Sequence, residues 1–449
     1  MNRRRTPTSQ QGRQPIRLAT PFPSWQTVRQ WPAHFRRIIL ATTADKNAWY
    51  LIVEMFWSAV LGGVATFNAT FALRLGAQNS HIGLLSSLPA LLAVAISIPA
   101  GRFISHRSRR KGWVLWSLFV HRLGYVIVAA VPWLPEGLAN RGGVLVYLLV
   151  TMSASATFFG VGWNSLLADV VPERRRATVF ATRNIVAVCI TSVVTLLSGL
   201  WLERILFPAN YQVLYGLGFL ASLVSLYFLT RMQVPDSPVV AVDSGTGRGL
   251  HERWRRLRSS IGAERAFMRI TVNTLLFGLP AWTVGPLYIL YYVRDLGASD
   301  SWIGLQATVA NVAAIAGYAL GQRLISRWGE ARMLKWTAPG AGLYPLLAGL
   351  FGSLTPLLVF LGIDGLIVPS INLSHFSTLL RSCPDDRRPL FIGFYTTVMN
   401  AGAFLAPLLG VALAERIGPM PVLIVCGILR ILMGLTFTLW PVEVPDAAS

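Results

Sequence analysis

Long apolar segments recur along the whole chain, and they restrict its fold more than any other feature. Runs of about 20 residues with almost no charge follow one another from residue 48 to residue 441, each long enough to cross a bilayer as a helix. The chain is 53% hydrophobic and 13% charged, whereas soluble proteins carry about 25% charged residues. The pattern predicts an all-α polytopic membrane protein.

The charges that flank these segments predict their orientation. About 32 of the 40 Lys and Arg fall in the N-terminal arm and in alternate loops, and about 5 fall in the opposite loops. The positive-inside rule therefore predicts a protein of the cell membrane with both termini in the cytoplasm. A net charge of +21 then reflects topology beside anionic lipid, and we expect no nucleic-acid binding. Twelve spans are expected, at 48–73, 81–104, 113–134, 143–166, 178–202, 210–230, 268–293, 302–325, 333–353, 356–378, 390–414 and 420–441.

One short sequence occurs twice, 221 positions apart. His81 opens H-I-G-L-L, followed by an apolar stretch and by R-F-I-S at 102–105; Trp302 opens W-I-G-L-Q, followed by R-L-I-S at 323–326. A Leu-Gly-Ala precedes each copy, and a later match pairs 163–167 with 375–379. Two parallel six-span halves joined by a long polar linker form a layout that transporters use.

This duplication predicts five regions. The arm has no acidic residue before Asp45, and its aromatic residues recur at helical spacing among arginines, which indicates an interfacial helix. The regions are a basic cytoplasmic arm with an interfacial helix (1–46), an N-terminal six-helix bundle (47–230), a cytoplasmic linker (231–267), a C-terminal six-helix bundle (268–441) and a cytoplasmic tail (442–449).

The segment from Gly101 to Lys111 resembles the signature between spans 2 and 3 of the major facilitator superfamily (MFS), Gly-x-Leu-x-Asp-Arg-x-Gly-Arg-Arg/Lys. The second copy, Gln322 to Arg332, keeps part of it. The resemblance implies two pseudo-symmetric six-helix bundles around a cavity that opens alternately to each side. It also implies a cytoplasmic gate, for which the candidate residues are Gly101, Ser105, Arg109, Arg110, Ser326, Arg327 and Gly329.

Both copies depart from this signature at one position. Ser105 and Ser326 stand where the family usually has an Asp that takes part in a charge interaction closing the cytoplasmic side. That role would then fall to arginine clusters against helix C-termini or to Asp169 and Glu173. The drug-antiporter signature of span 5 is also absent, although a relaxed form occurs in span 11 at 402–410.

Ionisable residues within spans are costly and therefore candidates for function. Glu54 and Asp364 lie on spans that line the cavity in this family, so each is a candidate for proton or substrate binding. The alternative is a structural carboxylate paired with an arginine, Arg122 for Glu54 and Arg430 for Asp364. Arg122 is itself a candidate for substrate contact, although a buried counter-ion is favoured. Arg183 is expected to extend toward the cytoplasmic surface. Further candidates are Asn68, Trp57, Asn273, Trp282, Tyr395 and Asn400, which could instead serve helix packing.

These features predict a secondary active transporter of a small solute, coupled to protons, and not an enzyme. A proton-coupled exporter of drugs or amphipathic compounds remains the first alternative, and a transporter fold that acts as a sensor or scaffold the second. We expect no cofactor and no metal, because the six His are scattered without metal-ligand spacing. We expect a monomer in the lipid bilayer.

Overall fold

The chain is all helical in the part that its structure, a computed structural model, describes. The described residues are 42–107, 109–135, 140–171, 173–234, 264–384 and 387–441. The expected interfacial helix in the arm, most of the linker and the tail lie outside them. Eleven described helices are long and apolar enough to cross a membrane.

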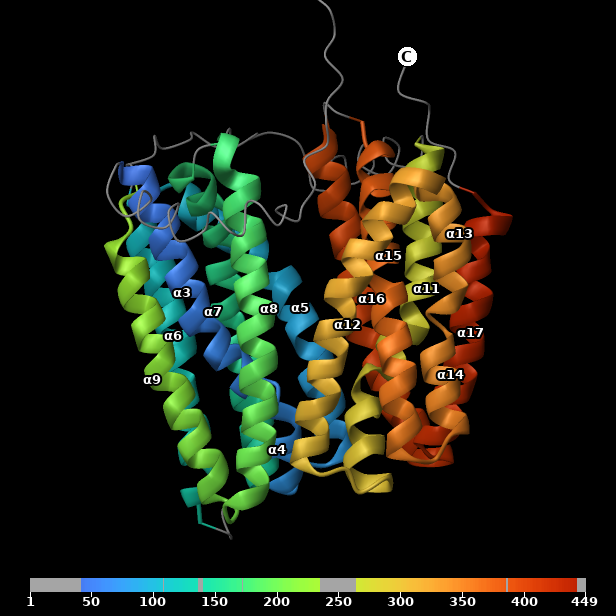
Figure 1. Ribbon diagram of the computed structural model, residues 1–449, viewed down its shortest axis with the longest axis horizontal. Coiled ribbons are helices and arrows are strands. Elements are labelled where there is room, and N and C mark those ends of the chain that lie inside the picture. Colours follow the sequence, from blue (N-terminus) through green and yellow to red (C-terminus); the bar gives the residue numbers. More distant parts are fainter. Residues whose placement is uncertain are drawn as a thin grey trace, which may run out of the picture.

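Each half contributes a bundle (Figure 1). The first contains α3 (Thr43–Ala65), α4 (Asn68–Arg74), α5 (Asn79–Ser105), α6 (Arg110–Ala130), α7 (Arg141–Val170), α8 (Glu173–Arg204) and α9 (Ala209–Arg231). The second contains α11 (Arg265–Leu290) with the short π-helix η2 (Tyr291–Asp295), α12 (Asp300–Trp328), α13 (Glu330–Gly340), α14 (Leu343–Leu350), α15 (Leu354–Arg381), α16 (Arg388–Ile417) and α17 (Pro419–Leu439).

The ninth span differs from its prediction, because a break divides the expected helix at 333–353 into α13 and α14. Pro345 has no N–H for the carbonyl of Ala341, and its ring would clash with that carbonyl in a continuous helix. Gly342 lies at the break, against α17, and a Cβ there would come within 2.6 Å of the Gly427 carbonyl oxygen. The ninth expected span is therefore present as two shorter helices, which is why eleven of the twelve expected spans are found unbroken.

The two bundles repeat the same helix pairings. In the first bundle α3 packs against α8 and α9; in the second, α11 packs against α16 and α17. The pair α5 and α7 corresponds to α12 and α15 in the same way. The contacts between bundles are repeated as well, since α8 packs on α12 and α5 packs on α16. The sequence duplication is thus a duplication of packing.

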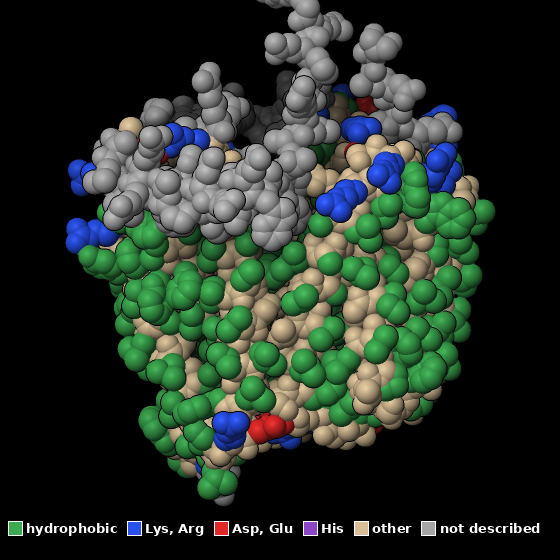
Figure 2. Space-filling view, viewed as in Figure 1, with side chains coloured by type: hydrophobic (Ala, Val, Ile, Leu, Met, Phe, Trp, Pro, Cys, Tyr) green, Lys and Arg blue, Asp and Glu red, His purple; other side chains and the backbone are tan. Residues whose placement is uncertain are grey.

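The outer surface matches a membrane environment. In Figure 2, apolar side chains cover the middle of the visible face, and the Lys and Arg gather along one rim. That rim is the end of the bundles at Arg231 and Arg265, which we call the linker side; the opposite end, at Gly76 and Gly297, is the far side. With the eleven candidate spans, this surface identifies a multi-pass membrane protein.

Among the described residues, the halves share a core only at the far side. One cluster of buried apolar residues contains Phe67 and Tyr211 of the first half together with Tyr291 and Ile303 of the second. On the linker side each half has separate clusters, around Leu51 in the first and around Phe267 in the second. The halves therefore pack tightly at one end and separately at the other, as Figure 1 shows.

Candidate functional site

Hydrogen bonds between the halves are confined to the far side and to the helix segments next to it within the described chain. The deepest links Thr308 Oγ1 of α12 to the Ser192 carbonyl oxygen of α8, at 3.1 Å. Small residues permit the close approach, because a Cβ on Gly199 or on Gly304 would come within 2.7 Å of backbone oxygen in the other half. On the linker side each half has its own apolar clusters, and none of the described hydrogen bonds joins the halves there.

The repeated Leu-Gly-Ala turns form a reciprocal arginine clamp across the far side. Arg74, just before the first turn, donates from Nη2 to the Ala298 carbonyl oxygen of the second turn, at 3.4 Å. Arg294, just before the second turn, donates from Nη2 to the Ala77 carbonyl oxygen of the first, at 2.5 Å. The glycines of both turns adopt positive φ, at 88° for Gly76 and 64° for Gly297, which explains why glycine recurs there.

Asp300 connects this clamp to the buried core. Its Oδ1 accepts a hydrogen bond from the Tyr211 hydroxyl at 2.9 Å and lies 3.5 Å from Arg74 Nη2. Tyr211 is fully buried and stacks on Phe71, with ring centroids 4.4 Å apart. Since Tyr211 and Asp300 belong to different halves, their hydrogen bond joins the halves at the far side.

A buried charge network lies inside the first bundle on the linker side of this contact. Glu54 accepts from Arg183 Nη2 at 3.1 Å and from the Ser225 hydroxyl at 3.0 Å, and Arg122 Nη2 lies 3.9 Å away. Arg122 also donates to the Ser222 carbonyl oxygen at 2.5 Å and to Ser225 at 2.7 Å. Both arginines and the glutamate are buried. The expected proximity of Glu54 and Arg122 is confirmed.

Arg183 corrects one expectation. It does not extend to the surface: it is 6% exposed, pairs with Glu54, and donates from Nε to the Leu51 carbonyl oxygen at 3.3 Å. Its guanidinium lies over the Trp163 ring, 5.2 Å from the centroid. Attraction to Glu54 and to the aromatic face stabilises the buried cation. Arg183, and not Arg122, is therefore the closer partner of Glu54.

The second bundle contains a neutral polar cluster that the sequence reasoning missed. The His375 Nε2 lies 2.7 Å from the Thr274 hydroxyl and 3.3 Å from the Tyr395 hydroxyl. These residues come from α15, α11 and α16. Of the three, Tyr395 alone was a candidate from the sequence. The other two gave no individual signal, because a threonine or a histidine within a span has many structural uses.

Asp364 and Arg430 do not form the expected ion pair, because no cation within the described chain lies within 4.0 Å of Asp364. The Arg430 guanidinium instead lies 5.0 Å from the centroid of the Phe277 ring, and its Nε has no hydrogen-bond partner. Asp364 is half-buried in the middle of α15. Its charge interacts with Arg430 only at longer range.

The remaining polar and aromatic candidates make contacts within their own bundles. Asn68 accepts from the Tyr215 hydroxyl at 2.7 Å, and Asn273 donates to the Trp440 carbonyl oxygen at 3.1 Å. Trp282 lies close to Gly278 and Gly402, where its ring occupies the space of a Cβ. Two further candidates have local interactions: Asn400 bonds to its own helix at the Thr396 carbonyl oxygen, and Trp57 contacts the neighbouring Phe56 ring.

The gate serines bond within their own helices. Ser105 donates to the Arg102 carbonyl oxygen at 2.9 Å, and Ser326 donates to the Arg323 carbonyl oxygen at 2.8 Å. The other candidates of this motif lie nearby at the linker side, where Gly329 adopts a φ of 79° between α12 and α13 and Arg110 is oriented toward the Arg107 carbonyl oxygen. Three more, Gly101, Arg109 and Arg327, lie at helix ends on that side. No described hydrogen bond of either serine joins the two halves.

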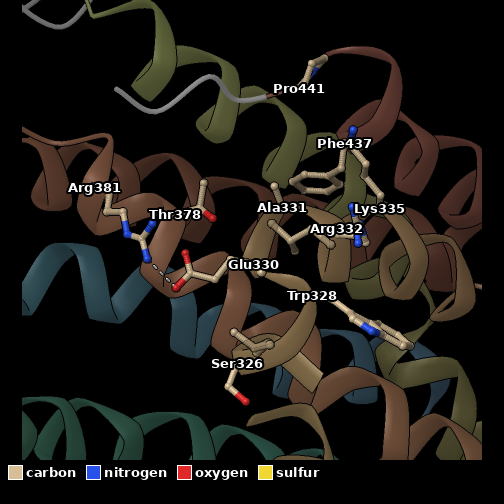
Figure 3. A pocket seen from close by; sticks show the side chains of 13 residues that line it. Ser326, Trp328, Glu330, Ala331, Arg332, Lys335, Thr378, Arg381, Phe437 and Pro441 are labelled. Carbon is tan, nitrogen blue, oxygen red and sulfur yellow. Dashed lines mark hydrogen bonds and ion pairs between the residues drawn. The ribbon is translucent and has the colours of Figure 1, made fainter. Parts of the chain in front are cut away.

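A carboxylate does stand next to the second serine, at a position that the motif comparison did not single out. Glu330 accepts from Arg381 Nη2 at 2.9 Å and from the Ser377 hydroxyl at 2.6 Å. Glu330 and Arg381 line a pocket of about 680 Å³ on the linker side of the second bundle, where they face each other (Figure 3). In the first half, Lys111 donates to the carbonyl oxygens of Thr230 and Met232 at the C-terminal end of α9. The side chains of Asp169 and Glu173 lie outside the described atoms.

Two parallel repeats that share a core at the far side form the two bundles of this membrane protein. The sequence profile of the Major Facilitator Superfamily matches residues 50–272 and 270–449. The chain therefore belongs to this superfamily and is a membrane transporter. Among the described residues, no group of three or more His, Cys, Asp and Glu is placed to hold a metal ion.

Solved structures confirm the fold. A POT family transporter in complex with a thioalcohol-conjugated peptide is 13% identical, with a TM-score of 0.67 over 90% of this chain and 100% of that one. A D-xylose–proton symporter is 15% identical, with a TM-score of 0.62 over 90% and 97%. The nucleoside transporter NupG, in a mutant form, is 11% identical, with a TM-score of 0.63 over 87% and 99%. No curated protein sequence matches the chain significantly. At these identities the likeness establishes the architecture and not the substrate.

Proposed function

We propose that this protein moves a small solute across the cell membrane by alternating access, in exchange or symport with protons. The single observation that carries the proposal is the contrast between the two sides, with a shared core and a clamp at the far side and separate cores at the linker side. Rigid halves that meet at one end can rock about a central site and expose it to each side in turn.

The conformation described here opens to the cytoplasm in this proposal. The linker side carries the Lys- and Arg-rich loops, which the positive-inside rule places in the cytoplasm. The far side, closed by Arg74, Arg294 and Asp300, then faces outward. Opening outward requires these contacts to break while new ones form among the linker-side loops.

Proton coupling has its best candidate in Glu54. The carboxylate is buried within the membrane, and Arg183 holds it from α8, a helix that also contacts the other half. Movement of α8 during the rocking of the halves would change the distance from Arg183 to Glu54 and so allow proton uptake and release. Proton coupling is compatible with this architecture, which a D-xylose–proton symporter shares.

The experiment uses purified protein in liposomes. A thermal-shift screen against a solute library first selects ligands, and their uptake is then measured with and without a proton gradient. We expect Glu54→Gln to abolish gradient-driven uptake and to leave counterflow intact, while Glu415→Gln, an exposed far-side control, changes neither. Unchanged gradient-driven uptake in Glu54→Gln would refute the assignment of Glu54.

Two alternatives predict different results. A proton-coupled exporter of drugs or amphipathic compounds would bind bulky apolar ligands in the same screen. It would move them outward while protons move inward. A sensor or scaffold would bind its ligand without counterflow, and wild-type protein that binds a solute but never exchanges it would overturn the transport proposal.

A further inference from the structure

The two polar clusters occupy equivalent positions in the duplicated halves. With the register that aligns 163–167 with 375–379, Trp163 corresponds to His375 and Arg183 corresponds to Tyr395. In each half these two residues touch: Arg183 lies over the Trp163 ring, and the Tyr395 hydroxyl reaches His375. The duplication has thus kept one contact between neighbouring helices while its chemistry diverged.

The third member of each cluster obeys the same relation. Glu54 of α3, the first span, pairs with Arg183. With the offset of 221 that relates the earlier spans, Glu54 aligns with Leu275 on α11, one position from Thr274, which contacts His375. Each half therefore contributes one cluster from corresponding helices at a corresponding depth, charged in the first half and neutral in the second.

Both clusters lie on helices that form the boundary between the halves. In α8, Arg183 is nine residues from Ser192, the deepest contact with the second half, which corresponds to about 13 Å toward the linker side. In α16, Tyr395 is twelve residues from Pro407, whose carbonyl oxygen lies beside Gly83 of the first half, or about 18 Å. Each cluster thus lies on a helix that contacts the other half nearer the far side.

The first cluster carries an excess of positive charge. Arg122 and Arg183 share a single carboxylate, so the buried network has a net charge of +1 among the described side chains. A net charge within the hydrocarbon region is costly unless a counter-ion compensates it. Arg183 uses Nε and Nη2 for Leu51 and Glu54, and within the described chain its Nη1 has no hydrogen-bond partner. One end of the guanidinium thus remains available.

We propose that the two clusters are the two ends of one substrate site and that the substrate is a small organic anion. Its carboxylate or phosphate group binds Arg183 beside Trp163, and its polar group at the other end exchanges hydrogen bonds with His375 and Tyr395. Guanidinium matches these anions in geometry, and the neutral cluster can both donate and accept. This inference rests on the proposed transport function and specifies its substrate class.

The first test needs no knowledge of the substrate. Iodide and acrylamide are used to quench the fluorescence of Trp163, which is isolated as the difference between wild type and Trp163→Phe. A positively charged cavity concentrates anions, so we expect iodide to quench Trp163 about ten-fold more strongly in wild type than in Arg183→Gln. Arg183→Lys retains the charge and should retain the quenching. Acrylamide should not distinguish these variants.

The control is Arg416→Gln, which removes an exposed arginine at the far side and should leave iodide quenching unchanged. Arg183→Gln should fold, because the remaining Glu54 and Arg122 form a neutral pair. Equal iodide quenching in wild type and Arg183→Gln would overturn the anion site. So would equal loss in Arg416→Gln, since quenching would then follow the net charge of the protein.

The second test compares matched compounds in the thermal-shift screen, each carboxylate beside its primary amide. We expect carboxylates to stabilise wild type and to lose that advantage in Arg183→Gln, and Tyr395→Phe to weaken their binding about ten-fold while the preference for anions remains. Stabilisation and transport of neutral solutes alone would refute this inference and leave the transport proposal standing. Anion binding by a protein that shows no counterflow would instead refute the transport proposal and leave the anion site standing.

Discussion

Removing the carboxylate of Asp300 should open the far side. In Asp300→Ala the buried Tyr211 hydroxyl loses its acceptor at 2.9 Å, and Arg74 loses its counter-ion at 3.5 Å. A hydrogen bond to a charged group contributes about 1.5–3 kcal/mol. Arg74 is 38% exposed, so its ion pair adds less than about 0.5 kcal/mol after solvent screening.

In this proposal the hydrogen bond from Tyr211 to Asp300 forms only when the far side is closed. Its whole free energy therefore changes the equilibrium between the state with a closed far side and the state with an open one. About 2 kcal/mol corresponds to a factor of about 30, which would change a 99-to-1 preference for the closed state to about 3 to 1. Asp300→Asn keeps an acceptor for Tyr211 and should have a much smaller effect. The control is Glu415→Gln, which removes an exposed far-side carboxylate.

Spin labels on Leu206 and Phe351 can measure this opening. Both are exposed at the far side, one in each half, and neither takes part in the clamp. We expect a longer distance to gain population in Asp300→Ala, to gain little in Asp300→Asn and to stay as in wild type in Glu415→Gln. If Asp300→Ala and Glu415→Gln gave the same distance distribution, the clamp would not control the far side.

Three further predictions concern stability, measured as thermal unfolding in detergent. Gly410→Ala should lower the free energy of unfolding by about 1–3 kcal/mol, because its Cβ would lie 2.1 Å from the Thr283 carbonyl oxygen; Gly393→Ala, with open space, should not. Glu54→Ala should cost about 3–5 kcal/mol by leaving two buried arginines without their carboxylate, and Arg122→Met less than half as much. Ser105→Ala and Ser326→Ala should each stay within about 0.5 kcal/mol, as their hydroxyls bond only to their own helices. A loss of more than about 1 kcal/mol in either serine variant would show contacts that this conformation does not contain.

The number of spans and the duplication could be predicted because both depend on local properties of the chain. A run of about 20 apolar residues satisfies its backbone only as a helix in lipid, whatever surrounds it. The break in the ninth span was also within reach of the sequence, since Pro345 forbids the hydrogen bond to Ala341. A proline in a span is often tolerated, however, so its effect depends on how the neighbouring α17 packs.

The candidate site was only partly predictable. The sequence singled out Glu54 because a carboxylate within a span needs a partner. It could not identify Arg183 as that partner, because its place a few turns into α8 also suits a side chain that extends to the surface. The His375 cluster was harder to foresee, since it brings together three helices and its only sequence signal is the register with Trp163 and Arg183.

The sequence by itself determined that this protein spans the membrane many times, that it consists of two copies of one half, and which ends of its helices carry the positive charge. Hydrophobicity, length and repetition decide these features, and they act along the chain. Only the tertiary structure decided that Arg183 is buried against Glu54, that Arg74 and Arg294 clamp the repeated turns, and that the halves share a core at the far side. These features depend on which faces of distant helices meet, and the energy of a buried charge or a close contact is set by the partner across that interface.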